Sequence, residues 1–233
     1  NNSTDLIIAI IKLIEDRMNA PHDILEEGVR AILLVEDSVR YYSTYLPLLY
    51  KLVLQQNQIA IRDALNEKQQ LLRKRARPKV LLATCYDEAI ETYRRYETNI
   101  IGVISDIGFV LHKGDPSSTE KLDAGIDLCR LIRKENPTMP FLMQSSQEAM
   151  SSIAKQLKVG FVVKTSKTLT QELSAYIERE FGFGDFVAID PRSGKEIARA
   201  SDLEAFERVI STISSAAFRR LSDNNYLSKW LFA

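Results

Sequence analysis

Five short apolar runs recur along the chain, and they constrain its fold more than any other feature of the sequence. Each run is continuous rather than alternating, which is typical of parallel strands that helices cover on both faces. Segments with helical periodicity separate the runs, which are Ala31–Val35, Val80–Ala83, Ile100–Ile104, Phe141–Met143 and Gly160–Val163. Buried strands that alternate with helices predict an α/β fold, a doubly wound five-stranded parallel sheet with right-handed crossovers.

The predicted helix after the first strand is unusually long. Ser38 and Pro78 bound a connection that far exceeds what one crossover needs. We therefore expect an extended first helix that projects beyond the sheet, with a helical insertion over residues 54–78 that packs on a partner surface. The basic stretch from Arg73 to Lys79 is interpreted as the solvated end of this helix, where cations oppose the helix dipole favourably.

The two ends of the chain carry further predicted elements. Ser3 or Thr4 can cap a helix that runs to about Met18 and is apolar on all sides, so we expect it to be buried against a neighbour. Beyond the sheet, Gly182-Phe-Gly184 marks a boundary. A hairpin of Phe186–Ile189 with Glu196–Ala198 and two amphipathic helices, Asp202–Ile213 and Ala216–Leu231, follow it.

These observations predict three parts of the chain. Residues 1–28 form an amino-terminal helix and linker, and residues 29–181 form the sheet domain with its insertion. Residues 182–233 form a small carboxyl-terminal α+β appendage. We see no internal repeat.

Charge and cysteine usage limit the class of function. The 31 basic and 31 acidic side chains cancel, so no overall field attracts nucleic acid or an anionic membrane, and neither is predicted as a partner. The longest apolar run, Leu6–Ile11, is too short to cross a bilayer. Cys85 and Cys129 lie far apart, as expected of free thiols in a reducing compartment. We therefore predict a cytoplasmic protein.

Acidic and cationic residues follow the predicted strands. Glu36 and Asp37 follow the first strand, Asp106 the third, Ser145 the fourth and Lys164 the fifth. All of them lie at the carboxyl edge of the sheet, where ligands bind in such folds. Three converging carboxylates repel one another unless they are protonated or bridged by a hard divalent cation, and oxygen ligands suit Mg²⁺. With the cation bound, Asp106 at the middle strand is the best placed nucleophile toward a phosphoryl group.

This arrangement resembles the receiver domain of two-component response regulators, the CheY-like form of the flavodoxin fold. The resemblance covers about Ile32 to Phe181. It is carried by four segments in the family's order: AILLVEDS (31–38), GVISDIG (102–108), PFLMQSS (140–146) and GFVVKTS (160–166). The chain departs from the family pattern at Thr165, where a proline is usual, and in the enlarged loop His112–Thr119 beside Asp106.

The resemblance assigns a role to each residue that matches the family's motifs. Asp106 would be the phosphoacceptor, and Mg²⁺ would be held by Glu36, Asp37, Asp106 and the carbonyl of Gly108. Ser145 would be the switch hydroxyl and Lys164 the lysine that contacts the phosphoryl group. Phe161 would be the switch aromatic that rotates on activation.

The function that the resemblance implies is a phosphorylation-dependent switch in a phosphorelay. The partners would be a histidine kinase or phosphotransfer protein, an output domain of the same longer chain, and optionally a second copy in a homodimer. Such a module is not an enzyme in the usual sense. The alternative is a pseudo-receiver, an interaction module without phosphoryl chemistry. A phosphatase of the haloacid dehalogenase type needs a second aspartate two residues after the nucleophile, where this chain has Gly108.

The tail has a resemblance of its own. It is similar to the region that follows receiver-like domains in large bacterial proteins of the phosphoenolpyruvate synthase or pyruvate, phosphate dikinase type. The matching segments are Phe186–Ile189, Arg199-Ala200, Asp202–Glu204 and Asn225–Leu231. The resemblance implies that the chain is the regulatory amino-terminal part of such a protein, with the dikinase chemistry elsewhere.

Overall fold

The computed structural model describes residues 3–62, 77–190, 195–223 and 226–232. The chain divides into two compact units, residues 1–174 and 175–233, which we call unit 1 and unit 2. The second unit begins a few residues before the boundary predicted at residue 182.

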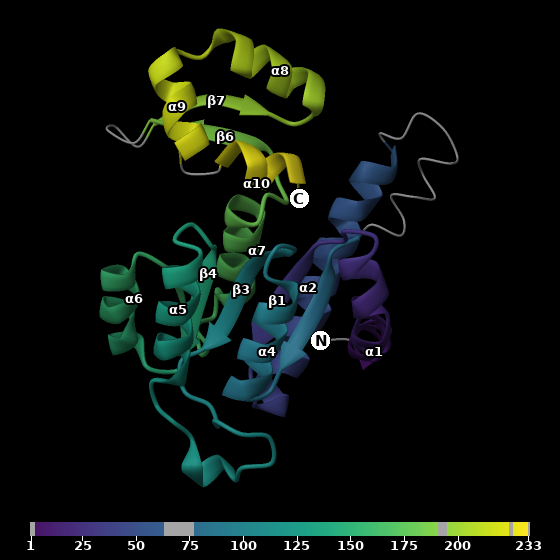
Figure 1. Cartoon of the computed structure of the whole chain (residues 1–233), viewed down its shortest axis with the longest axis vertical. Helices are drawn as coiled ribbons and strands as arrows, with labels where there is room; N and C mark the ends of the chain where they lie inside the picture. Colours follow the sequence, from purple (N-terminus) through teal and green to yellow (C-terminus); the bar gives the residue numbers. More distant parts are fainter. Residues whose placement is uncertain (1–2, 63–76, 191–194, 224–225, 233) are drawn as a thin grey trace. The chain divides into compact units, whose positions relative to one another are not determined.

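Unit 1 is built on a five-stranded parallel sheet (Figure 1). Its strands are β1 (Ala31–Val35), β2 (Lys79–Ala83), β3 (Ile100–Asp106), β4 (Phe141–Ser145) and β5 (Gly160–Val163). Their spatial order is β2-β1-β3-β4-β5, the doubly wound order that flavodoxin and CheY share. The predicted fold class is confirmed.

Helices connect the strands and cover both faces of the sheet. They are α2 (Val39–Arg62), α4 (Tyr86–Tyr96), α5 (Ala124–Glu135) and α6 (Ser151–Leu157), with short 3-10 turns at Ser117–Thr119 and Glu148–Met150. A further helix, α7 (Leu169–Glu180), follows β5, and the boundary between the two units falls within it. Leu33 and Val35 of β1 lie in one core with residues of α4, α5 and α6. In Figure 1, α2 lies on the opposite face of the sheet, and it buries Leu46, Leu49 and Val53.

The amino-terminal helix α1 (Ser3–Leu25) is longer and more exposed than predicted. It packs on α2 and β2, and it continues through Pro21 instead of ending near Met18. Its buried face is narrow and consists of Ala9, Asp16, Ala20 and Ile24. The predicted packing of this helix against a neighbour is confirmed for one face, whereas the predicted end near Met18 is wrong.

A buried charge network fastens α1 to unit 1. The Asp16 carboxylate is fully buried and accepts hydrogen bonds from the Tyr50 hydroxyl at 2.8 Å and from the backbone N–H of Val80 at 2.9 Å. It also forms a bidentate ion pair with Arg77, at 2.5 and 3.1 Å. Lys79 pairs with Asp23, nearer the end of α1, at 2.5 Å. The Asp16 contacts hold the middle of α1, and the Lys79–Asp23 pair holds its last turn beyond Pro21.

The same network corrects the interpretation of the basic stretch. Arg77 and Lys79 are 8% and 6% exposed, so they are buried partners of α1 and not part of a solvated helix end. Residues 63–76, which include most of the predicted insertion over 54–78 and the rest of the basic stretch, lie outside the described residues.

Unit 2 contains the predicted hairpin and a small helical layer. Strands β6 (Phe186–Ile189) and β7 (Glu196–Ala200) are antiparallel, and α8 (Leu203–Thr212), α9 (Ser215–Asp223) and α10 (Tyr226–Phe232) follow them. The rings of Phe186, Phe206 and Trp230 contact one another in its core. The Trp230 indole donates a hydrogen bond to the carbonyl of Gly184 at 2.8 Å.

None of the described helices combines the length and the apolar character that crossing a bilayer requires.

Candidate functional site

The register of the sheet brings the predicted site residues to one edge. Val35, the last residue of β1, pairs with Ser105, the residue before Asp106. Asp106 in turn pairs with Gln144, and Ser145 pairs with Val163. Because the strands are parallel, the residues that follow them share this edge. Glu36, Asp37 and Lys164 therefore converge with Asp106 from three segments of the sequence.

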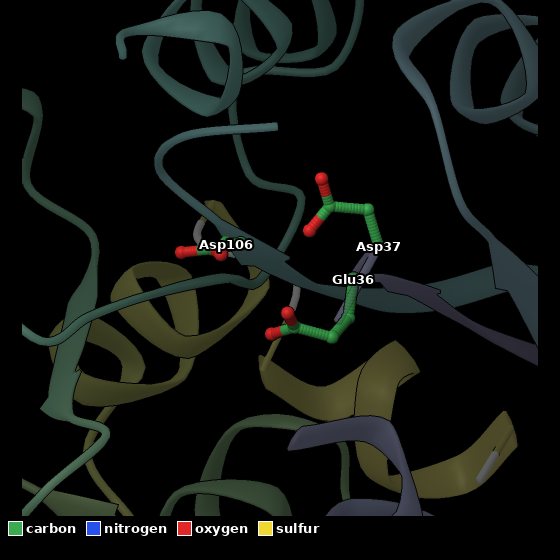
Figure 2. A group of neighbouring side chains, drawn as sticks. All are labelled: Glu36, Asp37 and Asp106. Carbon is green, nitrogen blue, oxygen red and sulfur yellow. The ribbon is translucent and has the colours of Figure 1, made fainter. Parts of the chain in front are cut away.

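Three carboxylates form the centre of the site (Figure 2). Glu36, Asp37 and Asp106 each offer an oxygen atom, and these atoms all lie within 4.8 Å of one another. Glu36 is fully buried and Asp106 is 9% exposed, whereas Asp37 is half-buried. The group is thus open to solvent on the side of Asp37 and closed on the side of Glu36.

Lys164 is the cation of the site. Its ammonium group pairs with Glu36 at 2.7 Å and with Asp106. The ring of Tyr41, on α2, packs against the ammonium, with the nitrogen 4.2 Å from the ring centroid. Lys164 is itself 8% exposed, so the ion pairs are shielded from water and the ammonium is held between the two acids.

Backbone and amide groups fix the orientation of the carboxylates. Asp106 Oδ1 accepts a hydrogen bond from the backbone N–H of Ile107 at 2.7 Å. Glu36 accepts one from the backbone N–H of Ser38 at 3.2 Å and another from the side-chain amide of Gln144 at 3.0 Å. The acids are therefore held in place before any ligand arrives.

Burial shifts the proton affinity of both inner acids. Desolvation, together with the charge of Asp106, raises the pKa of Glu36 from its ordinary value to about 7. The pKa of Asp106 is also raised, chiefly by burial, although Lys164 and the Ile107 N–H oppose the shift. Carboxylate repulsion adds to the effect of burial, because three carboxylates face one ammonium and the ionised cluster carries excess negative charge.

A glycine at the start of α5 allows the backbone behind Asp106 to come close. Gly125 donates its N–H to the Ile107 carbonyl at 2.8 Å. A β-carbon at Gly125 would lie 2.0 Å from the backbone oxygen of Asp106. Only glycine fits this approach, which sets the position of the strand end that carries Asp106.

The remaining predicted residues are Ser145, Phe161 and Gly108. Ser145 ends β4, is 8% exposed, and its hydroxyl accepts a hydrogen bond from the backbone N–H of Gln147 at 3.1 Å. Phe161 in β5 is half-buried and packs against the core on the α4 to α6 face. Gly108 lies two residues after Asp106. Its predicted roles and those of Ser145 and Phe161 stay predictions.

The sequence analysis missed polar residues that line the site. Gln144 lies in a strand that was predicted to end at Met143, and a polar residue that extends an apolar run was the available signal. The hydroxyl of Tyr45 and Oε1 of Gln144 are buried without a hydrogen-bond partner in the described part of the chain. Burial raises the pKa of Tyr45, and the negative charges of Glu36 and Asp106 add to the shift. Tyr45 thus borders the cluster on its closed side.

Glu120 is a fourth acid beside the site. A bridge between Phe109 and Lys121 closes the enlarged loop at its base. This places the Glu120 carboxylate against Gly108, where a β-carbon would meet its oxygen at 2.4 Å. Burial and the charges of Asp37 and Asp106 raise the pKa of Glu120. No periodicity in the loop could have indicated this position.

Solved structures similar to this chain are response regulators. A receiver domain protein from Clostridium thermocellum has 19% sequence identity and a TM-score of 0.39, and the match covers 64% of this chain and 92% of that one. A two-component response regulator of the LuxR family from Aurantimonas has 21% identity and a TM-score of 0.38, covering 64% and 83%. TrrA from Thermotoga maritima, solved with Mg²⁺-BeF, has 14% identity and a TM-score of 0.35, covering 64% and 99%.

These scores are too low to add to the argument, so the fold assignment here depends on the strand order. A scan of protein-family models found no match, and a search of curated proteins found none either.

Proposed function

We propose that this chain is a response regulator receiver module that is phosphorylated on Asp106. The observation that supports this proposal is the cluster of three carboxylates within 4.8 Å of one another at the carboxyl edge of the sheet, with the buried ammonium of Lys164 paired to two of them. A purely structural cluster would not need three acids for one cation.

The donor set fits a hard divalent cation. Carboxylate oxygens are the ligands that Mg²⁺ prefers, and it usually binds through one or two of them while keeping several waters. Glu36, Asp37 and Asp106 would hold the ion together with the carbonyl of Gly108. When bound, the cation would neutralise charge on the transferring phosphoryl oxygens.

The residues of the chain supply the rest of the chemistry. An Asp106 oxygen forms a bond to phosphorus while the donor's bond to phosphorus breaks, and the leaving group keeps that electron pair. The Ile107 N–H holds the other Asp106 oxygen, which orients the nucleophile. The Lys164 ammonium, which pairs with Asp106, would contact the phosphoryl oxygens and stabilise their negative charge. Ser145 would hydrogen-bond the new phosphoryl oxygen and transmit its presence with Phe161.

The proposal includes the partners that such a module needs. A histidine kinase or phosphotransfer protein would be the phosphodonor, and the change at Ser145 and Phe161 would act on an output domain. The dikinase-type output domain that the tail resembles belongs to this proposal. The chain would catalyse only its own phosphorylation and dephosphorylation, and it would not be an enzyme in the usual sense.

Intact mass spectrometry after incubation with acetyl phosphate and Mg²⁺ tests the proposal. We expect a gain of about 80 Da, one phosphoryl group, that is lost in Asp106→Asn and when Mg²⁺ is chelated. Ser146→Ala is a matched control, because Ser146 is exposed beside the site and has no assigned role. An unchanged mass with several small donors would favour the pseudo-receiver, whose carboxylates serve only to hold Lys164.

A further inference from the structure

The exposed side of α1 carries an apolar ridge. Its side chains are between 44% and 76% exposed, and they are Ile7, Ile10, Ile11, Ile14 and Met18. At 3.6 residues per turn, residues 7, 11, 14 and 18 fall within about 60° of one another around the helix axis. Asp16, which faces unit 1, lies on the opposite side of the helix. We call these five residues the α1 ridge.

The α1 ridge is a preformed surface. Asp16, Arg77 and Tyr50 fix the far side of the helix to unit 1, so the ridge does not need to order on binding. The ridge carries no charged residue, so two like ridges can meet without repulsion. Its spacing of three and four residues is the pattern by which helices pack along a seam.

We propose that the α1 ridge is the contact surface between two copies of this chain. With Ile8 at its border, which is 44% exposed, the ridge offers roughly 600 Å² of apolar surface, at the upper end of the range for the largest apolar patch on a monomer. Two ridges would bury about 1,000 Å² in total, which is the lower limit for a specific interface. The contact would be symmetric, with the same patch on both subunits. This inference is independent of the proposed phosphorylation.

Sedimentation equilibrium on the full chain tests the proposal. We expect the wild type to dimerise and the double variant Ile11→Glu with Ile14→Glu to have a dimer dissociation constant about a hundredfold higher, because these residues lie at the centre of the ridge. Both residues are exposed, so the fold should tolerate the changes, and an unchanged circular dichroism spectrum would verify this. Leu203→Glu is the matched control, since Leu203 is 65% exposed on α8 and should leave the dimer intact.

Cross-linking supplies a second readout. The native cysteines are both buried, so Ile11→Cys introduces an exposed thiol that a symmetric contact brings near its copy. We expect a short thiol-specific reagent to join two chains through this residue but not through Leu203→Cys. A wild type that stays monomeric at the highest attainable concentration would overturn the proposal. A dimer that survives both glutamates would overturn it too.

Discussion

Replacing Asp16 with asparagine should destabilise the protein more than any other change of a single charge outside the candidate site. The side chain is fully buried, and its two oxygens accept bonds from Tyr50, Val80 and both terminal nitrogens of Arg77. Asparagine keeps the shape but removes the charge, and it turns an amide N–H toward the guanidinium. Arg77 would then be a buried cation with its main partner lost.

The magnitude follows from the burial of both partners. Breaking a buried ion pair from one side costs about 3–5 kcal/mol, because the remaining charge is uncompensated. The asparagine oxygen can keep one or two of the hydrogen bonds, so we expect the lower half of that range. For a chain of this length, a loss of about 3 kcal/mol lowers the melting temperature by roughly 6–12 °C.

Urea unfolding followed by circular dichroism measures the effect, with Glu15→Gln as the control. Glu15 also pairs with a cation on α1, at 2.6 Å from Lys12, but this pair is largely exposed. Exposed pairs contribute at most about 1 kcal/mol. A loss below about 1 kcal/mol in Asp16→Asn would show that water replaces the carboxylate, and the account of a buried network would be wrong.

Three other predictions concern the candidate site. Gly125→Ala should cost about 2 kcal/mol or more in urea unfolding, because its β-carbon would meet the Asp106 backbone, whereas Gly108→Ala meets only the end of a flexible side chain and should be tolerated. Mg²⁺ should raise the melting temperature by mass action, and a full response in Asp37→Asn would remove that residue from the metal site. The raised pKa of Glu36, about 7, means that the folded state binds its proton more tightly than the unfolded state. Without metal, stability should therefore fall by up to about 3 kcal/mol as pH rises from about 4 to 7, and Glu36→Gln should flatten the profile.

The sheet could be predicted from the sequence because its strands are apolar on both faces. Ala31–Val35 and Gly160–Val163 were predicted with the bounds that the structure has. The third and fourth strands extend further than predicted, because Ser105 and Gln144 are polar but fully buried. The hydropathy pattern shows where the apolar residues of a strand end, but the backbone hydrogen bonds between the strands continue past that point.

The site was predicted because its residues follow strands, and a parallel sheet sets where strands end. Glu36, Asp106 and Lys164 come together as expected. Gln144 extends an apolar run, which was a local signal in the sequence. The position of Tyr41 against Lys164 depends on how α2 packs, and no local pattern encodes that. The burial of Arg77 could not be predicted from local sequence either, since its partner Asp16 is 61 residues away.

Unit 1 has a cluster of charged side chains at each end of its sheet, and the two clusters differ in their net charge. At the amino end of β2, Asp16 and Asp23 face Arg77 and Lys79, so the charges cancel and the cluster needs no ligand. At the carboxyl edge three carboxylates face one ammonium. That excess must be removed by protonation or by a bound cation. The first cluster is therefore balanced within the chain, whereas the second carries the excess negative charge that the cation of the proposed function would neutralise.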